Sequence, residues 1–472
     1  MSKRLYINTI GCQMNVYDSE QIENSLRPLG YEPTPFVESA DLIITNTCAI
    51  REKAEQKAFS FLGRLSRLKR KNADLIIGVG GCVAQQQGRQ ILKRMPHVDL
   101  VFGTHALSRL PLAIKKIAHQ RCRIVDVEMS EFSQEAEMQL VVTPTDAISK
   151  FVTIMRGCDN YCAYCVVPYV RGRETSRNPD RIVSEIKLLA RSGVREVTLL
   201  GQNVNSYGKK EGLCSFAELL FRINEIEGLA RIRFTTSHPQ DLSEDLIGAF
   251  HRLDKLCHHM HLPVQSGSNR ILKRMNRKYT REVYLEKVGR LREVCPQMAI
   301  TSDIIVGFPG ETMADFEDTV SLIRQLRYDS LFVFNYSDRP SAPSRKFPRK
   351  VDEQEKKSRL QHVLYVQAAI TAEINAEMVG SQELVLVEGH SKRQPMENGK
   401  AMDRPVQWSG RTRCNKIVNF VIDGSEKTMT ADITGNTVRV NIERALSHSL
   451  WGRWHQDTSA NSGLKGDKSY AA

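Results

Sequence analysis

The first third of the chain alternates short apolar runs with longer segments in which apolar positions recur every three or four residues, as on one face of a helix. The apolar runs cover residues 5–10, 41–46 and 74–79, and the helix-like segments cover 19–27 and 52–68. Alternation of strands and helices is typical of a parallel sheet with helices on its faces. We therefore expect an N-terminal α/β domain over residues 1–129.

A polar, aperiodic stretch at residues 130–148 interrupts this alternation and is typical of a linker. The alternation then resumes, with strand candidates at 151–156, 195–201, 231–236, 258–262, 299–306 and 330–336. Six βα units in about 190 residues are too few for a closed eight-stranded barrel, so they predict a partial (β/α)6 barrel. With the charged, helix-like segment 351–378, we place this central domain at residues 149–378.

Short strand-like runs separated by glycine and polar turns follow at 383–388, 415–421, 428–433 and 436–441. Runs of this kind predict a small all-β barrel, which we place at residues 379–446. Residues 447–472 end in a polar stretch rich in small residues, and we expect a disordered tail there. The predicted fold class is therefore α/β, followed by a small all-β domain.

The composition is that of a globular protein, with 472 residues of which 41% are hydrophobic and 26% charged. No apolar run is long enough to span a membrane, and the first residues lack the pattern of a secretory signal. We therefore expect a cytoplasmic protein that does not contact a membrane. In a reducing compartment, an odd count of 11 cysteines indicates metal or redox chemistry rather than a disulfide framework.

The formal net charge of +13 is concentrated in two stretches. Residues 51–72 carry eight basic and two acidic side chains, and residues 270–292 carry nine basic and two acidic ones. Two basic stretches predict a polyanionic partner, most simply nucleic acid. The alternative is a pair of solvated helix faces that bind nothing.

Three cysteines at CxxxCxxC spacing, Cys158, Cys162 and Cys165, follow the strand candidate that begins at residue 151. A closed zinc site needs four ligands, and no histidine lies nearby. A 4Fe-4S cluster also has four corners, so three cysteines leave one iron open for a non-protein ligand. The spacing predicts such a cluster. The alternatives are a zinc site completed from elsewhere and three cysteines that only pack.

A second set of cysteines, Cys12, Cys48 and Cys82, lies just beyond three successive strand-like runs. Because the carboxyl ends of parallel strands meet at one edge of a sheet, these thiols could converge and hold a second cluster. Buried strand-end cysteines without a metal are the alternative. The remaining cysteines have no partner at ligand spacing and are interpreted as packing residues: Cys122, Cys214, Cys257, Cys295 and Cys414.

With these motifs the chain resembles the radical S-adenosylmethionine (SAM) methylthiotransferases over residues 1–450, and most of all those acting on isopentenyladenosine in bacterial tRNA. The segments that carry the resemblance are 11–15, 46–53, 199–207 and 261–268. It implies that the central domain is a radical SAM barrel. It also implies that the C-terminal barrel is an RNA-binding TRAM domain, which residues 410–413 and 418–420 match. The chain departs from the family pattern at 339–343, and at 396–407, which resembles a loop insertion.

The reaction implied by the resemblance is methylthiolation of the adenine C2 carbon of isopentenyladenosine at position 37 of tRNA, beside the anticodon. That carbon has no useful acidity, so the reaction needs a radical rather than a general base. In the family, the CxxxCxxC cluster binds SAM, whose cleavage gives the radical. The cluster on the other three cysteines delivers sulfur, and a second SAM supplies the methyl group. An electron donor such as flavodoxin or ferredoxin is implied as a partner.

The resemblance also implies SAM contacts from side chains near the ends of the barrel strands. They are Tyr164, Gln202, Asn203, Ser237, Gln265, Ser266 and Asp303, with the turn at 307–311 against the adenine of SAM. Helix caps are the alternative role for these polar residues.

The tRNA anticodon stem-loop would contact the two basic stretches, including residues 69–71, and the barrel residues Arg411, Arg413, Lys416 and Phe420. Two alternatives stay open. One is a methylthiotransferase for threonylcarbamoyladenosine or a ribosomal protein, and the other is a metal-stabilised RNA-binding protein without catalysis.

Overall fold

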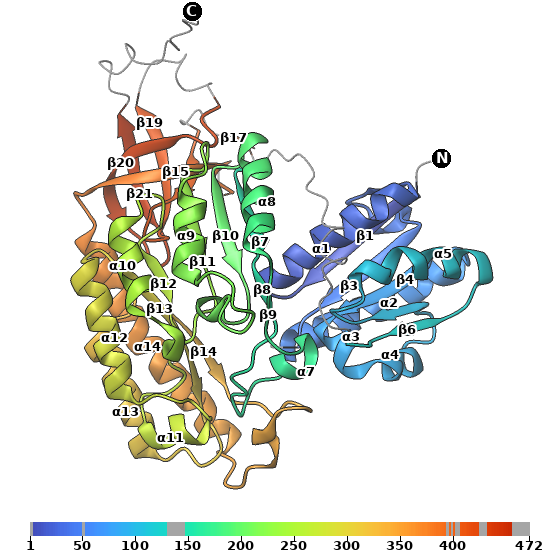
Figure 1. The fold of residues 1–472 in the computed structure, drawn as a ribbon, viewed down its shortest axis with the longest axis horizontal. Coiled ribbons are helices and arrows are strands. Elements are labelled where there is room, and N and C mark those ends of the chain that lie inside the picture. The colour runs from blue at the N-terminus through green and yellow to red at the C-terminus, as the bar shows by residue number, and fades with distance from the viewer. Residues whose placement is uncertain are drawn as a thin grey trace, which may run out of the picture.

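The chain forms an N-terminal α/β unit, a central open barrel and a small C-terminal barrel (Figure 1). The computed structural model describes residues 3–49, 52–129, 147–392, 396–397, 400–401, 406–423 and 432–455. Most of the predicted linker, residues 130–146, lies outside this range, as does 456–472 of the predicted tail. No helix of the described residues is long and apolar enough to cross a membrane.

The N-terminal unit is built on a parallel sheet with the strand order β2-β1-β3-β4-β5-β6. The strands are β1 (Lys3–Ile10), β2 (Tyr31–Pro33), β3 (Leu42–Thr47), β4 (Ile76–Gly81), β5 (Leu100–Phe102) and β6 (Ile124–Asp126). β3 and β4 are buried throughout, as expected for strands with helices on both faces. The predicted parallel sheet is confirmed.

Helices cover both faces of this sheet. The helices are α1 (Gln13–Leu26), α2 (Glu52–Lys71), α3 (Cys82–Gln87), α4 (Arg89–Arg94) and α5 (Leu110–Gln120), with short 3-10 turns at Arg27–Leu29, Val37–Ser39 and Leu107–Arg109. Apolar side chains of α1 and α5 pack with one face of β3, through Leu42 and Ile44. Those of α2, α3 and α4 pack with its other face, through Ile43. Successive strand residues thus support opposite helix layers.

The central domain contains two parallel three-stranded sheets, β7-β10-β11 and β12-β13-β14, joined by a single bridge between Ile232 and Leu256. The strands are β7 (Ser149–Thr153), β10 (Glu196–Leu200), β11 (Arg231–Phe234), β12 (His259–His261), β13 (Ala299–Val306) and β14 (Ser330–Asn335). This order gives the predicted open barrel of six strands. The strand expected at 151–156 is split, because β8 (Met155–Arg156) pairs antiparallel with β9 (Thr175–Ser176).

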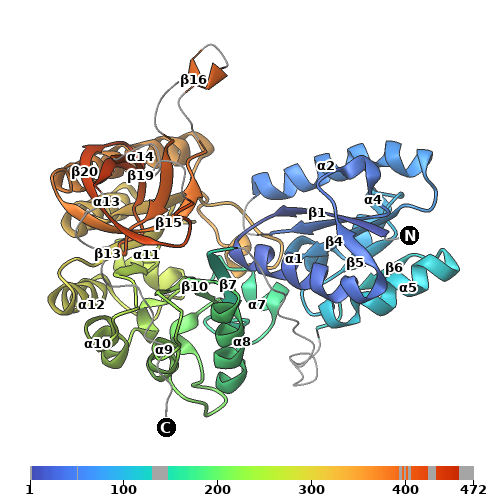
Figure 2. The same cartoon turned by 90° about the horizontal axis from the view of Figure 1, so that it is seen from above.

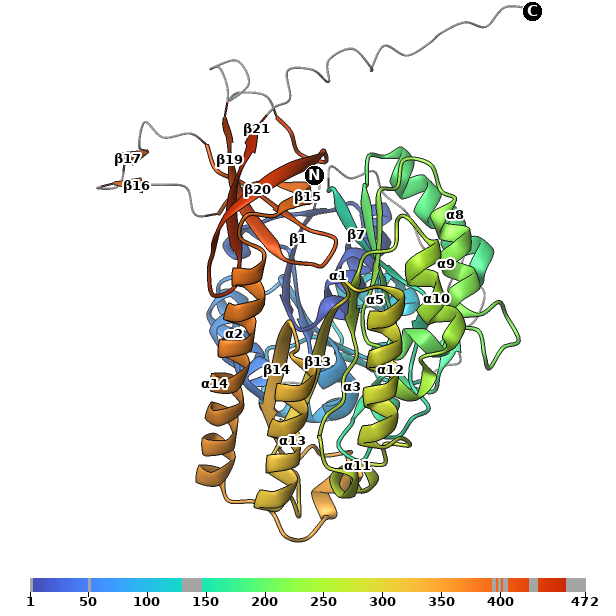
Figure 3. The ribbon, with the colours of Figure 1, turned by 90° about the vertical axis from the view of Figure 1, so that its left-hand side faces the viewer.

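Helices form the outer layer of the central barrel (Figure 3). The long ones are α8 (Pro179–Arg191), α9 (Phe216–Asn224), α10 (Glu244–Arg252), α12 (Arg281–Val294), α13 (Met313–Leu326) and α14 (Glu353–Glu377). Two short ones are α7 (Val167–Arg171) and α11 (Asn269–Arg274), and 3-10 turns lie at Val204–Ser206, Pro239–Asp241 and Pro343–Lys346. Their apolar faces and the strands share one large core.

The C-terminal domain is a closed barrel with the strand order β15-β18-β19-β21-β20. Its strands are β15 (Gln382–His390), β18 (Trp408–Arg411), β19 (Ile417–Asp423), β20 (Thr437–Ala445) and β21 (Leu450–His455). A separate antiparallel pair, β16 (Met396–Glu397) and β17 (Lys400–Ala401), lies in the segment 396–407 that was interpreted as a loop insertion.

The predicted small barrel is confirmed, but β18 and β21 were not predicted as strands. The expected boundary at residue 446 is too early, because β21 pairs in parallel with β19 and completes the barrel. In the strand expected at 428–433, residues 432 and 433 are not in a strand and the others lie outside the described residues.

Candidate functional site

The cysteines Cys12, Cys48 and Cys82 lie at the carboxyl ends of the neighbouring strands β1, β3 and β4. Cys12 precedes α1, Cys48 directly follows β3, and Cys82 begins α3. The Cys12 and Cys48 thiols are within hydrogen-bonding reach of each other. The predicted convergence of these residues at one sheet edge is therefore what the strand order produces.

Two buried asparagines tie the first two cysteine segments together. Asn15 Nδ2 donates to Asn46 Oδ1 at 2.9 Å, and Asn46 Nδ2 donates back to the carbonyl oxygen of Asn15 at 2.9 Å. The backbone N–H of Cys12 donates to Asn15 Oδ1 at 3.2 Å. These bonds fix the start of α1 against the end of β3, and with it Cys12 relative to Cys48. Both asparagines lie in the segments 11–15 and 46–53 that carry the resemblance, but no role was predicted for them.

Gly81 allows the third cysteine to approach the same edge. Its φ is +90°, and a Cβ at this position would lie 2.3 Å from the carbonyl oxygen of Thr47. Only glycine tolerates both the conformation and this contact. The end of β4 therefore packs directly on the end of β3, which sets the position of Cys82.

A buried ion pair supplies positive charge at this edge. Arg171, from the end of α7 in the central domain, donates to Asp18 of α1 at 2.7 Å, and each side chain is only 5% exposed. The hydrogen bond from Cys48, together with the positive charge of Arg171, lowers the pKa of Cys12 to about 6. Burial raises the pKa of Cys82, and Arg171 opposes that rise. Arg171 thus favours the thiolate form that binds metal.

The CxxxCxxC loop lies between β8 and α7 and is held from outside by two other segments. The N–H of Ala163 donates to the carbonyl oxygen of Met275 at 2.8 Å, and Asn276 Nδ2 donates to that of Tyr161 at 2.9 Å. The N–H of Ser344 donates to the carbonyl oxygen of Ala163 at 2.9 Å. Residues far along the chain therefore fix the loop that carries the three thiols.

Arg277, which follows α11, is a charged residue that contacts this loop. Its side chain is buried, and its guanidinium donates to Cys162 Sγ at 3.5 Å and to the Tyr164 hydroxyl at 3.4 Å. Burial raises the pKa of Cys158 to about 11 and that of Cys165 to about 12. These two thiols would therefore bind a metal centre only with release of their protons.

The two cysteine sets fit iron–sulfur clusters better than single ions. Among the described residues, no three His, Cys, Asp or Glu side chains converge on a position for one metal ion. A zinc ion needs its sulfur ligands about 2.3 Å from one centre. Each thiolate on a cluster binds a separate iron, so cluster ligands lie further apart. The donor set, three cysteines twice, disfavours the zinc alternative.

Several of the expected SAM residues present unpaired polar atoms at the strand ends. Four buried atoms after β10 and β11 have no hydrogen-bond partner among the described residues: Gln202 Nε2, Asn203 Oδ1, Ser237 Oγ and His238 Nε2. Gln202 Oε1 meanwhile accepts from the N–H of Gly157 at 2.5 Å, directly before Cys158. Because buried polar atoms are rarely left unpaired, this row fits a polar ligand beside the cysteine loop. His238 was missed by sequence reasoning.

The other expected SAM residues have partners within the protein. The Gln265 N–H donates to the carbonyl oxygen of Asp303 at 2.9 Å, which places these two residues side by side. The Asp303 carboxylate lies 3.6 Å from the His261 ring. The Ser266 hydroxyl lies 3.4 Å from that of Thr319. Ser266 is thus part of the scaffold beneath the strand ends.

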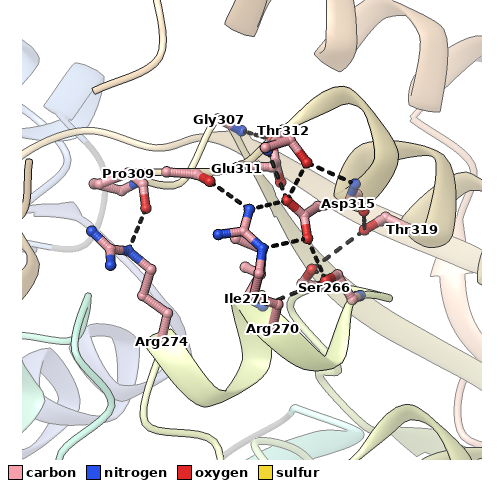
Figure 4. Close-up of polar contacts among 12 residues, drawn as sticks. Ser266, Arg270, Ile271, Arg274, Gly307, Pro309, Glu311, Thr312, Asp315 and Thr319 are labelled. Atoms are coloured by element: carbon pink, nitrogen blue, oxygen red, sulfur yellow. Dashed lines mark hydrogen bonds and ion pairs between the residues drawn. The ribbon is translucent and has the colours of Figure 1, made fainter. Parts of the chain in front are cut away.

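The turn at residues 307–311 is fixed by α11 (Figure 4). The Gly307 N–H donates to the Glu311 carboxylate at 2.6 Å. Arg274 Nε donates to the carbonyl oxygen of Pro309 at 2.7 Å. Arg270 donates to the carbonyl oxygen of Gly310 at 2.7 Å and also pairs with Asp315. The turn is thus held rigidly where the resemblance places the adenine of SAM.

These contacts change the interpretation of the basic stretch 270–292. Of its nine basic side chains, seven bind groups of the protein itself: Arg270, Arg274, Arg277, Arg281, Lys287, Arg290 and Arg292. Many of the acceptors are backbone carbonyl oxygens. Because these oxygens carry no formal charge, the stretch keeps its high net charge although its side chains are bound within the protein. The contacts do not support the RNA-binding role expected for this stretch.

The barrel residues expected to contact RNA are also engaged internally. Arg413 donates to the carbonyl oxygen of Leu256 at 2.7 Å, and Lys416 pairs with Asp329 at 3.0 Å. Phe420 is buried in the barrel core. Arg411 pairs with Glu388 at 2.9 Å and keeps partial exposure. Three of these four residues therefore have partners or packing within the protein, and only Phe420 is too deeply buried for the expected contact with a base.

The basic stretch 51–72 is different, because most of its described charges lie exposed on α2. The exception is Lys69, whose Nζ pairs with Asp99 at 2.8 Å and also donates to the carbonyl oxygen of Leu75. Of the three residues expected to bind phosphates, only Arg70 and Lys71 are exposed. The charge of α2 therefore remains available to a partner.

Comparison with known proteins is consistent with this architecture. Residues 4–103 match the Uncharacterized protein family UPF0004, and residues 152–323 match the Radical SAM superfamily. In solved structures, the fold is similar to the radical S-adenosylmethionine methyltransferase TsrM from Kitasatospora setae, with a TM-score of 0.53, 13% identity and coverage of 84% of this chain and 78% of that one.

Curated relatives align over almost the whole chain. The protein named tRNA-2-methylthio-N(6)-dimethylallyladenosine synthase in Desulfosudis oleivorans is 57% identical, covering 95% of this chain and 96% of the relative. The protein of the same name in Syntrophus aciditrophicus is 51% identical, covering 95% and 94%. With two separate cysteine triplets on the folds that these matches describe, the chain belongs to the tRNA-2-methylthio-N(6)-dimethylallyladenosine synthase family of radical SAM enzymes.

Proposed function

We propose that the chain methylthiolates the adenine C2 carbon of isopentenyladenosine at position 37 of tRNA, using SAM and two 4Fe-4S clusters. The observation that carries the proposal is the pair of cysteine triplets: one lies at the edge of the N-terminal sheet, the other in the loop after β8. The names of the full-length relatives supply the reaction and the substrate. When bound, the clusters and SAM would supply the radical, the sulfur and the methyl group that an unactivated C–H bond requires.

In this proposal the two triplets have different roles. Cys158, Cys162 and Cys165 hold the cluster that binds SAM, and Arg277 balances the charge of their thiolates. The other triplet would hold the second cluster, which would supply the sulfur when bound, and Arg171 would balance the charge of its thiolates.

The row of unpaired polar atoms after β10 and β11 would bind the polar groups of SAM. Gln202 would also position the cysteine loop through Gly157. Asn203 and Ser237 offer the other unpaired atoms. Tyr164, Gln265 and Asp303 complete the proposed cofactor site.

An apolar contact between the two domains would keep water from the space between the triplets. Met14 and Tyr17 of α1 pack with Leu200 at the end of β10, with Cys12 and Phe151 beside them. Exclusion of water protects a reactive radical from side reactions. The proposed domains are the N-terminal unit at 1–129, the radical SAM barrel at 149–378 and an RNA-binding barrel that begins at 379 and extends through β21.

Partners of the proposed reaction are the tRNA anticodon stem-loop and an electron donor such as flavodoxin or ferredoxin. An unstacked loop base is accessible to an enzyme, which supports the stem-loop as the recognised element. A radical reaction of this kind must also be supplied with electrons.

The test is competition among three otherwise identical anticodon stem-loops carrying prenylated, threonylcarbamoylated or unmodified adenosine. Burial of a five-carbon prenyl group would contribute several kcal/mol, at about 0.8 kcal/mol per CH2. Burying the unpaired charge of a threonylcarbamoyl group in the same pocket would be costly. Product from the prenylated loop, measured by nucleoside mass spectrometry, should dominate by at least about tenfold. Equal turnover of the carbamoylated loop would contradict the substrate assignment.

A parallel assay separates the enzyme from a non-catalytic RNA-binding protein. Protein purified without oxygen should contain iron and sulfide and show broad visible absorption. A protein stabilised only by zinc would show neither.

A further inference from the structure

A basic groove lies beside the N-terminal cysteine edge, between β1 and α2. It has a volume of about 800 Å³ and is lined by Tyr6, Asn8, Ile10, Lys53, Gln56, Lys57, Ser60, Phe61 and Arg64. Its three cationic residues belong to the basic stretch 51–72, but the rings of Tyr6 and Phe61 and the strand residues of its wall have no role so far. The groove is open, and three of its nine lining residues are cationic while none is acidic.

The cationic side chains follow one stripe of α2. Lys53 and Lys57 are four residues apart and Arg64 follows seven residues later, a spacing that keeps them on one helix face. Lys53, Lys57 and Arg64 are all exposed, and the stripe extends over about 16 Å. An array of this length matches the backbone of a short single strand rather than one small anion.

Two aromatic side chains, Tyr6 and Phe61, also line the groove. Tyr6 and Phe61 stack with their ring centroids 6.2 Å apart and their planes at 26°. The Arg64 guanidinium lies 5.6 Å from the centre of the Phe61 ring. Both rings are only partly buried. Aromatic faces beside a cationic groove are the elements that bind unstacked bases and their phosphates.

The position of the groove connects it to the chemistry. Ile10 lines the groove and Cys12 is two residues further on, so their Cα atoms are at most about 7 Å apart. Helix α2 also lies on the same side of the molecule as the C-terminal barrel and α14, and opposite to α8–α10, in both perpendicular views (Figures 2 and 3). A single RNA molecule could therefore touch the barrel and the groove from one side.

We propose that the groove between β1 and α2 binds the single-stranded anticodon loop next to the target adenosine, with a base on the Tyr6–Phe61 pair and phosphates on Lys53, Lys57 and Arg64. This inference rests on the proposed function, and it names the part of the substrate that this surface recognises. An acidic electron-donor protein would also be attracted by the charge. Charge attraction to such a protein would, however, not account for the partly exposed rings of Tyr6 and Phe61 in the groove.

The test measures binding of the holoenzyme to a fluorescent anticodon stem-loop between about 50 and 200 mM salt. The double variant Lys53→Glu/Lys57→Glu should weaken binding at least about tenfold and lower the salt slope by about 1.4, or 0.7 for each lost phosphate contact. Phe61→Ala should weaken binding at least about fivefold without changing the slope, since stacking releases no counterions. Phe61→Leu preserves the apolar packing and should show the same loss.

The matched control is Lys115→Glu/Lys116→Glu, the same charge change at exposed positions of α5, which packs on the opposite face of the same sheet. The control should retain parental affinity and slope, and every variant should contain parental iron. If the groove variants bind RNA like the parent while the parent methylthiolates it, the groove proposal is wrong and the function stands.

Two further outcomes separate the proposals. If the groove variants bind RNA normally but accept electrons more slowly from reduced flavodoxin, the groove is a protein-docking site and the RNA proposal is wrong. If the variants lose RNA affinity as expected but the parent forms no methylthio product, the groove proposal holds and the proposed function fails.

Discussion

Replacement of Asp18 by Asn should loosen the contact between the two cysteine-bearing domains. Asp18 of α1 accepts from Arg171 at 2.7 Å, and both side chains are 5% exposed. The substitution retains the shape of the side chain but removes its charge, so the buried Arg171 loses the carboxylate that it binds directly. Removing one partner of a buried pair costs about 3–5 kcal/mol, several times the value of an exposed pair.

Hydrogen exchange of the iron-free protein is the appropriate assay, because a bound cluster would itself supply negative charge to Arg171. At about 1.4 kcal/mol per factor of ten, the loss predicts roughly a hundredfold to a few thousandfold faster exchange in peptides of α1. Peptides from β20 and β21 lie in another domain and should exchange at the parental rate. The mass-spectrometric experiment therefore contains its own reference.

The double variant Asp18→Leu/Arg171→Met tests the reasoning directly. Replacing a buried ion pair by apolar side chains is often neutral or stabilising, so α1 should regain most of its protection. If Asp18→Asn accelerates exchange less than about fivefold, as expected for a solvent-screened pair, the ion pair does not hold the domains together. If the double variant is no better than the single one, the unpaired charge is not the cause of the loss.

Three further predictions concern the cysteines and α2. The reconstituted chain should hold about eight irons, and changing Cys158, Cys162 and Cys165 together to Ala should leave about four by iron assay; retention of all eight would contradict the ligand assignment. Replacing Cys12, Cys48 or Cys82 by Ala should abolish the methylthio product in nucleoside mass spectrometry but leave reductive SAM cleavage, and loss of cleavage at normal radical-site iron would refute this division. Lys69→Met should lower the free energy of unfolding by about 1–2 kcal/mol in urea titrations because it removes the charged partner of Asp99, whereas exposed Arg70→Met should stay within about 0.5 kcal/mol.

The elements that the sequence predicted well are the longer strands with many apolar positions. β13 matches its expected bounds of 299–306 because five of its eight residues are apolar, and only Thr301, Ser302 and Asp303 interrupt them. The strands β2, β5 and β6 have three residues each, too few to show a period. β21 was missed because Gly452 and Arg453 separate its two tryptophans and hide the alternation of a strand.

The site was predictable only to the extent that it depends on local order. The strand-end cysteines could be found because strand and turn adjoin in sequence. The Arg171–Asp18 pair could not, since it forms only when two domains dock. Charge counting was misleading at residues 270–292, because it does not register neutral carbonyl oxygens, which are the acceptors for Arg274, Lys287 and Arg292.

The CxxxCxxC loop is held by hydrogen bonds to Met275, Asn276 and Ser344, which are synthesised after it, and this sets the order in which the two cysteine sites form. The sheet that carries the N-terminal triplet ends at residue 126 and its Arg171 contact follows soon after, so most of that scaffold is synthesised early. The loop at Cys158–Cys165 must wait for Ser344, about 180 residues after its last cysteine. At about 5–20 residues per second this is a delay of roughly 10–35 s, in which three thiols leave the ribosome without their clamp. The segments that hold these three thiols are therefore completed later in synthesis than the N-terminal sheet, and slower synthesis lengthens the interval in which the thiols are open to oxidation.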